Sequence, residues 1–185
     1  MTAEAREPRT PEPRPFHLDT KTSAIAVLDQ SATEGVPQPR QAQLWAGLAK
    51  FLERARASRV PIIFTLSNSR RGTPAGEVAP VLMRRDEEPV VFPDAFDKFM
   101  GGELQGFLSD RNVSDLVIVG SGTNVAVMYT ATTAARVHHY NVIIPIDGVN
   151  ARDLYEHEYA LHQLSVLPGA ATPVQFSTLS TVEFD

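Results

Sequence analysis

The fold of this chain is decided by residues 116–147, which read LVIVGSGTNVAVMYTATTAARVHHYNVIIPID. Residues 116–119 form a short apolar run rich in β-branched side chains, which is typical of a strand buried on both faces. The sequence GSG follows at 120–122, and glycine permits the backbone angles of a tight turn. Apolar side chains then recur at helical spacing over 127–135, and 141–146 is a second buried strand. The segment therefore predicts a strand, a turn, a helix and a strand.

The remaining sequence repeats this alternation of strand and helix. Further strands are expected at 23–28, 60–66 and 174–177, and helices at 41–57, 76–82, 103–110 and 152–167. Such alternation predicts one three-layer α/β/α domain with a mostly parallel, Rossmann-like sheet. We place this domain at residues 21–185, with 178–184 as its tail. Residues 1–20 are rich in Pro, Arg and Glu, and are expected to form a flexible N-terminal arm or a strap over a neighbouring subunit.

The composition argues against several classes of function. The chain of 185 residues has a net charge of −5 and no basic run, so nucleic acid is not an expected partner. The sequence contains no apolar stretch long enough to span a membrane and no signal-peptide core, which predicts a cytoplasmic protein with no membrane partner. Cysteine is absent, and the five His lack the spacing of zinc ligands. No metal site and no cofactor are therefore expected.

Two parts of the sequence are placed to form a ligand site. In open α/β sheets, ligands bind beyond the carboxyl ends of the strands, where loops turn into helices. Asp29 closes the first predicted strand, and the turn at 120–126 follows the central one. The free N–H groups at the start of the next helix favour negative charge, and Thr123 or Asn124 is expected to cap it. Considered alone, Asp29 is equally a common turn former.

Residues 120–131, GSGTNVAVMYTA, resemble the signature turn of the isochorismatase-like hydrolases, also called the cysteine hydrolase superfamily. That turn typically reads G-x-x-T-N-x-C-V-x-x-T-A, and it matches here at Gly120, Thr123, Asn124, Val127, Thr130 and Ala131. The resemblance extends from about Ser23 to the end of the chain. It implies the isochorismatase-like fold, a small-molecule substrate or ligand and a homo-oligomer. It also implies a non-proline cis peptide bond near Ser121–Gly122.

The resemblance assigns roles to two charged residues. In the family, an Asp at the end of the first strand is the acid/base residue, and this position is Asp29. Residues 92–104, FPDAFDKFMGGEL, resemble the segment that carries a catalytic Lys, which normally precedes a Phe by several residues. Here the only Lys in the segment, Lys98, is adjacent to Phe99. Either the loop is re-spaced so that Lys98 reaches the site and lowers the pKa of the carboxyl group, or the catalytic Lys is lost.

The turn itself supplies the predicted substrate-binding residues. These are Gly122, Thr123, Asn124 and Val125, whose backbone N–H groups face the site, and Tyr129, one turn into the helix. Tyr129 can donate a hydrogen bond into the cavity. Alternatively, it packs under a loop or across a dimer interface.

The loop after the second strand differs from that of the metal-binding nicotinamidases in the same superfamily. Those enzymes carry Asp and His ligands here, whereas this chain has Ser67, Asn68 and Ser69. The resemblance therefore implies that the metal site is missing. Arg70 and Arg71 follow, and they either meet an anionic substrate or form a solvated basic pair.

The nucleophile position of the family is occupied by Ala126. A methyl group cannot attack a carbonyl carbon, so the covalent amidase route is closed in this chain. Three hypotheses follow. The first is a hydrolase that uses Asp29 as general acid and water as nucleophile, as in the isochorismatases that cleave a vinyl ether and also lack this Cys. The second is a catalytically inactive relative that binds a small ligand or a partner. The third is a thiol amidohydrolase whose Cys was replaced by Ala to trap a substrate.

A second resemblance favours a natural alanine. One branch of the superfamily carries G-A-V-x-Y-T-A in the turn and P-x-D-G-x-x-A after the next strand. Residues 126–131 and 145–151 match these two patterns, whereas Val125 replaces the first Gly. The base sequence of codon 126 in the native gene decides between a natural and an engineered Ala126.

Overall fold

The computed structural model describes residues 10–32 and 38–185. Within them, a seven-stranded sheet has the order β4-β3-β2-β5-β6-β8, with β7 paired to β5 beyond the end of β6, and every paired strand is parallel. Its strands are β2 (Ser23–Leu28), β3 (Ile62–Thr65), β4 (Val90–Val91), β5 (Asp115–Ser121), β6 (Asn141–Pro145), β7 (Val149–Asn150) and β8 (Gln175–Ser177). The prediction of a mostly parallel sheet is confirmed.

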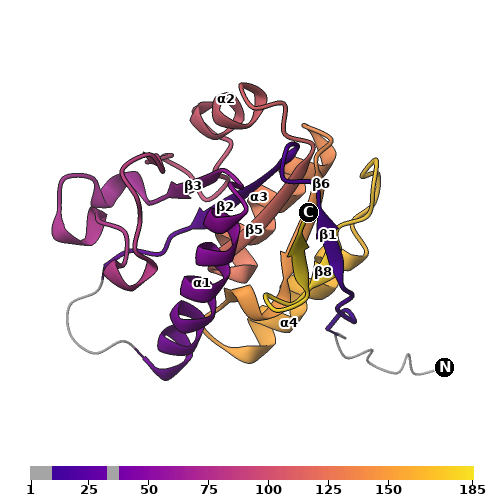
Figure 1. Cartoon of the computed structure of the whole chain (residues 1–185). Helices are drawn as coiled ribbons and strands as arrows, with labels where there is room; N and C mark the ends of the chain where they lie inside the picture. The colour runs from indigo at the N-terminus through magenta and orange to yellow at the C-terminus, as the bar shows by residue number, and fades with distance from the viewer. Residues whose placement is uncertain (1–9, 33–37) are drawn as a thin grey trace.

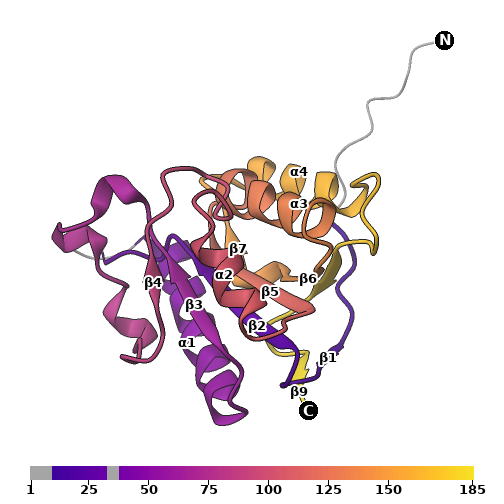
Figure 2. The same ribbon diagram turned by 90° about the horizontal axis from the view of Figure 1, so that it is seen from above.

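Helices cover both faces of this sheet (Figure 1). α1 (Pro39–Ala57) packs on one face, and α3 (Met128–Arg136) and α4 (Leu154–Ser165) lie together on the other, as Figure 2 shows from above. The short helix α2 (Glu103–Ser109) contributes its buried leucines to the same core as α3 and α4. The three-layer α/β/α architecture is confirmed.

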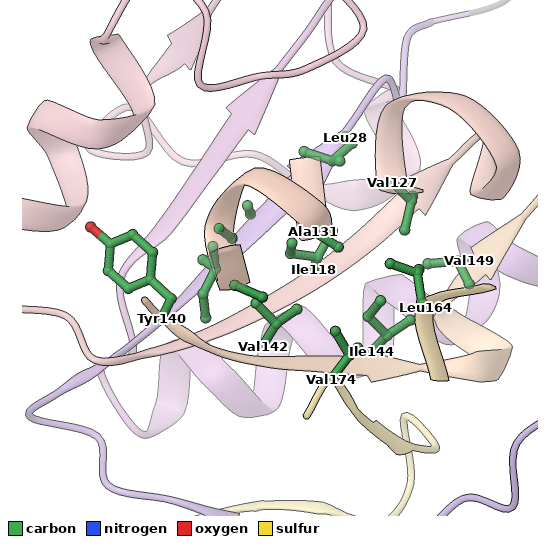
Figure 3. Close-up of a cluster of buried hydrophobic side chains, with 14 of the residues drawn as sticks. Leu28, Ile118, Val127, Ala131, Tyr140, Val142, Ile144, Val149, Leu164 and Val174 are labelled. Carbon is green, nitrogen blue, oxygen red and sulfur yellow. The ribbon is translucent and has the colours of Figure 1, made fainter. Parts of the chain in front are cut away.

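The strands alternate their side chains between two hydrophobic cores. In β5, Leu116 and Ile118 pack with α3 and α4, whereas Val117 and Val119 pack with α1. This is the two-residue period of a strand buried on both faces. Figure 3 shows the first core, where Val127 and Ala131 lie against the strands. The helix after the turn is thereby fixed to the sheet.

One predicted helix is wrong. Residues 76–82 do not form one helix, because two 3₁₀ turns, Pro74–Gly76 and Pro80–Leu82, stand there instead. Between them, Val78 forms a β-bridge with Ser31. Pro80 lacks an N–H group, and it therefore begins a new turn rather than continuing a helix.

The two ends of the described chain pair with each other. β1 (Phe16–Leu18) lies parallel to β9 (Val182–Phe184), forming a separate two-stranded sheet. Sequence reasoning missed both strands, since it placed them in a flexible arm and a tail. For residues 16–18 the prediction of flexibility is wrong, and residues 1–9 of the predicted arm lie outside the described residues.

Among the described helices, none combines the length and apolar character needed to cross a membrane.

Candidate functional site

The candidate site lies where β2 and β5 end side by side. Leu28 is in register with Gly120, so Asp29 and the turn after β5 are neighbours at the carboxyl edge of the sheet. Gly120 has φ of +120°, and a Cβ there would collide with the carbonyl oxygen of Leu28. Only glycine allows the two strands to approach this closely at the position where the turn begins.

Asp29 and Lys98 form an ion pair in this site. The Lys98 ammonium lies 3.0 Å from Oδ1 and 2.9 Å from Oδ2 of Asp29. Its side chain is 2% exposed, whereas that of Asp29 is 26% exposed. Asp29 has φ of +52°, a conformation uncommon for residues other than glycine, and its N–H donates to the Thr65 carbonyl of the neighbouring strand at 2.9 Å. The carboxylate is therefore oriented by both its backbone and its partner.

Contacts with α3 and with the residues directly after it bring Lys98 to Asp29. The Lys98 N–H donates to the Thr130 hydroxyl at 3.0 Å, and the hydroxyl of Thr133 donates to Asp97 at 2.6 Å. Next to them, the ring of Phe99 stacks on His138 with centroids 4.5 Å apart. These three contacts position the loop that carries Lys98. Of the two sequence alternatives for Lys98, the structure has the one in which it reaches Asp29.

Burial raises the pKa of Asp29 above its ordinary value, because the surrounding protein disfavours the charged form. Lys98 and, to a smaller extent, Arg70 oppose this effect. We expected Lys98 to lower the pKa of this carboxyl group. Lys98 does lower this pKa, but burial raises it more, so the net shift of the Asp29 pKa is upward.

Arg70 and Arg71 have different surroundings. Arg70 donates from Nη1 to the Ser31 hydroxyl at 2.9 Å and acts electrostatically on Asp29. Arg71 lies over the ring of Phe92, 5.3 Å from its centroid. Of the two, Arg70 is the one that faces the candidate site.

Ala126 stands inside a single π-helical turn, Thr123–Val127, that joins β5 to α3. Ala126 is 1% exposed. The Ser121–Gly122 peptide bond before the turn is cis, as the family resemblance implied. The predicted cap is wrong, because the N-cap is Gly122 and the turn has no side-chain cap. The buried Thr123 hydroxyl instead lies 2.9 Å from Nδ1 of His157 in α4.

The predicted substrate-binding residues differ in how accessible they are to a ligand. Asn124 and Val125 are partly exposed beside Gly122, which is where a ligand in the turn would contact them. Thr123 is fully buried, so its side chain serves the turn. Tyr129 is 49% exposed on α3, which fits a role at an interface better than a ligand contact within one chain.

A partly buried polar network next to the turn was missed by sequence reasoning. Gln30 donates from Nε2 to the Leu28 carbonyl at 3.0 Å and to the Ser121 hydroxyl at 2.8 Å. Its Oε1 accepts from the Trp45 indole and from Gln41, each at 2.9 Å. The only sequence signal was a polar residue directly after Asp29.

Asn150 closes this network into a ring. The Ser121 hydroxyl donates to Oδ1 of Asn150 at 2.5 Å, and Nδ2 of Asn150 donates to Oε1 of Gln41 at 3.3 Å. Since Ser121 begins the turn and Gln30 follows Asp29, the ring connects the two halves of the site. Hydrogen-bond networks of this kind, shielded in part from solvent, rigidify the groups that they contain.

In residues 10–32 and 38–185, no group of three or more His, Asp or Glu side chains is arranged to hold a metal ion. Ser67, Asn68 and Ser69 lie at the start of the loop after β3, where Asn68–Arg70 forms a 3₁₀ turn and the hydroxyls of Ser67 and Ser69 are 2.9 Å apart.

Comparison with known families shows that the model of the isochorismatase domain matches residues 26–177. The matched range contains Asp29, Lys98 and Ala126. No curated protein sequence matches the chain at a significant level.

Several solved structures share the fold. A cysteine hydrolase from Pseudomonas syringae pv. phaseolicola aligns over 94% of each chain, with 20% identity and a TM-score of 0.74. An isochorismatase-like hydrolase from Alkaliphilus metalliredigens aligns over 86% of this chain and 95% of its own, with 24% identity and a TM-score of 0.73. An N-carbamoylsarcosine amidase from Thermoplasma acidophilum aligns over 85% and 96%, with 19% identity and a TM-score of 0.72. At these identities the likeness establishes the fold.

Proposed function

Since the chain belongs to the isochorismatase domain family, we propose that it hydrolyses a small molecule with Asp29 as general acid and without a covalent intermediate. The observation that carries this proposal is the ion pair between Asp29 and the buried Lys98 at the carboxyl edge of the sheet. A carboxyl group in a ligand site, with a perturbed pKa and a fixed partner, is a typical acid/base residue.

Ala126 determines the type of mechanism. Its methyl group cannot attack substrate, so the nucleophile is water. The raised pKa of Asp29 favours the protonated form that a general acid needs. Asp29 protonates the substrate, water adds to the electron-poor carbon that results, and the proton lost by that water returns to Asp29. The substrate bond is therefore one that breaks after protonation, such as a vinyl ether.

Lys98 acts on Asp29 rather than on the substrate. Its ammonium contacts both carboxylate oxygens, and its N–H is bound to Thr130. It fixes the direction in which Asp29 delivers the proton, and it stabilises the carboxylate that remains after transfer.

The position of Arg70 indicates that the substrate is an anion. It acts on Asp29 through space, is exposed, and donates to Ser31 through only one of its terminal nitrogens in the described residues. A guanidinium group in this position binds a carboxylate of the substrate bidentately. The substrate class that fits is a small carboxylic acid with an acid-labile ether or enol bond.

The test is a hydrolysis screen of small enol ethers, esters and amides that carry a carboxylate, followed by Asp29→Asn. We expect the substitution to lower kcat by about a hundredfold or more, as for other general acids. The matched control is Asp110→Asn, the same chemical change at the exposed end of α2. Unchanged turnover in Asp29→Asn would contradict the proposal.

The pH profile of the unmodified chain provides a test that does not depend on the stability of a variant. The general acid is active while Asp29 is protonated, so kcat falls as the pH rises through the pKa of Asp29. Because burial raises that pKa, the fall lies above the ordinary value of 3.8. A profile that rises over this range would mean that Asp29 acts as a base.

Ala126 also favours a second candidate, a catalytically inactive relative that binds a small acid at the same site. Its distinguishing result is calorimetric binding of an acid from the screen with no product after prolonged incubation. In that case Arg70→Gln weakens binding of the acid. Neither the unmodified chain nor Asp29→Asn turns the acid over.

A further inference from the structure

A cavity of about 300 Å³ opens at the other end of the sheet from Asp29. β3 runs from Ile62, which lines this cavity, to Thr65, which bonds the backbone of Asp29. The cavity and the candidate site are therefore separated by the length of β3, on the order of 10 Å. The proposed hydrolysis does not use this cavity.

Charged side chains dominate the lining of the cavity. Four arginines and two glutamates line it, giving it a net charge of +2: Arg56, Arg59, Arg85, Arg111, Glu87 and Glu88. The whole chain has a net charge of −5. Positive charge is thus concentrated in one hollow of an acidic protein, which raises the local concentration of anions.

One side of the cavity is formed by the ion pair of Arg56 and Glu88, which has no net charge. Arg56 donates to both carboxylate oxygens of Glu88, at 2.7 and 2.9 Å, and the two side chains are 4% and 6% exposed. The backbone N–H of Arg85 also donates to Glu88, at 2.8 Å. Because Glu88 is fully engaged by these bonds, it does not neutralise the other arginines.

Arg59 reaches the cavity from the turn between α1 and β3. It has φ of +61°, and backbone N–H groups of the turn already bond the last carbonyls of the helix, including that of Arg56. The end of α1 therefore does not require the Arg59 guanidinium group as a cap.

The two other arginines reach the cavity from separate segments. Arg111 lies over the ring of Phe107, 3.9 Å from its centroid, and donates to the Phe107 carbonyl at 3.0 Å. These contacts hold the guanidinium plane while its remaining N–H groups stay exposed. Arg85 forms an ion pair with Glu53 at 3.5 Å. Because the Glu53 side chain is exposed, solvent weakens this pair.

We propose that this cavity binds a small polyanion, bearing phosphate groups or several carboxylates, through Arg59, Arg85 and Arg111. Three guanidinium groups from separate segments line one hollow, and an anion between them would reduce the repulsion that Glu53 and Glu87 leave uncompensated. Guanidinium forks match the oxygens of phosphates and carboxylates. A cavity of about 300 Å³ limits the ligand to the size of a small metabolite.

The test is isothermal titration of the full chain at low ionic strength with two probes, inorganic pyrophosphate and citrate. We expect one-to-one binding of at least one probe, and the tighter of the two identifies the phosphate or the carboxylate class. The double substitution Arg59→Gln with Arg111→Gln should weaken binding about tenfold or more, because it removes two charge-assisted contacts. Arg111→Lys, which keeps the charge but loses the fork, should weaken it less.

Two control variants test whether the probe binds in this cavity. Lys50→Gln makes the same change of charge on an exposed face of α1, and Arg70→Gln removes the cation beside Asp29. Both should bind pyrophosphate like the unmodified chain, and pyrophosphate is the probe on which the controls are compared, because Arg70 is proposed to bind carboxylates. The proposal is overturned if neither probe binds, if the double variant with an unchanged melting temperature binds as tightly, or if either control loses as much affinity.

Discussion

At the scale of single residues, the two members of the Asp29–Lys98 pair differ in exposure. Lys98 is 2% exposed, whereas Asp29 is 26% exposed. A charge left without its partner is destabilising in proportion to how completely it is removed from water. The two partners should therefore respond differently to substitution.

We expect Asp29→Asn to lower the free energy of unfolding by about 3 kcal/mol and Lys98→Met by about half as much, because Asn leaves an enclosed ammonium group without a counter-charge. Urea unfolding at neutral pH measures both. The double variant should be less destabilised than the sum of the single ones, by about 1 kcal/mol or more. Additive losses would show that the two side chains do not stabilise each other.

Ala126, to which we assign the nucleophile position in the proposed function, also allows a chemical test. The chain has no cysteine, so Ala126→Cys introduces its single thiol, inside the first turn after β5. The start of a helix lowers the pKa of a thiol, and this turn leads directly into α3. We expect the new thiol to react with iodoacetamide at neutral pH faster than the exposed thiol of Ala46→Cys, followed by mass spectrometry. A slower reaction would mean that the position is inaccessible or not activated.

At the scale of secondary-structure elements, α4 is joined to the turn that carries Ala126. The Thr123 hydroxyl and Nδ1 of His157 are 2.9 Å apart. Burial lowers the pKa of His157, Arg40 lowers it further, and Glu158 raises it in part. The folded protein therefore favours neutral His157.

This shift predicts acid destabilisation near the turn. When the pH falls below the ordinary value of 6.5, the unfolded chain takes up the proton on His157 before the folded chain does, and stability is lost. His157→Gln cannot take up that proton, so its melting temperature should fall less between about pH 7 and about pH 5. His162→Gln, on the same helix, is the control. Parallel curves for the His157 variant and the unmodified chain would refute this origin of the pH dependence.

At the scale of the whole molecule, the paired strands β1 and β9 bring the two ends of the described chain together. Leu18 and Val182 are both fully buried in the core on the α1 side of the sheet. In addition, Arg54 of α1 donates to the Val182 carbonyl at 3.1 Å, and the rings of Phe51 and Phe184 lie with their centroids 5.5 Å apart. Through these side chains the small sheet is part of the domain core. Figure 2 shows β1 and β9 together beside the C-terminus.

We expect Leu18→Ala to lower the free energy of unfolding by about 3 kcal/mol, because it removes buried methyl groups and leaves a cavity. His17→Ala, in the same strand but exposed, should change it by less than about 1 kcal/mol, although it removes surface contacts with Glu183 and Asp185. Denaturant unfolding compares the two. Equal effects would mean that β1 is not part of the cooperative unit.

The sequence by itself determined the architecture and one half of the site. Apolar runs with β-branched residues and helical spacings are local signals, and they located the buried strands, the turn after β5 and Asp29 at the end of β2. The cis peptide bond at Ser121–Gly122 was implied by the family resemblance of this turn and not by a local physical signal.

Tertiary structure decided how the distant parts of the site meet. Lys98 and Asp29 are 69 positions apart in the chain, and no periodicity shows that the loop carrying Lys98 is attached to α3 through Thr130. The pairing of β1 with β9 spans almost the whole chain and left only short, mixed patterns in the sequence. The same holds for the ring through Gln30 and Asn150. Local sequence patterns indicate which face of each segment is buried. Contacts between distant segments form only when the packed sheet brings the ends of its strands to the same edge.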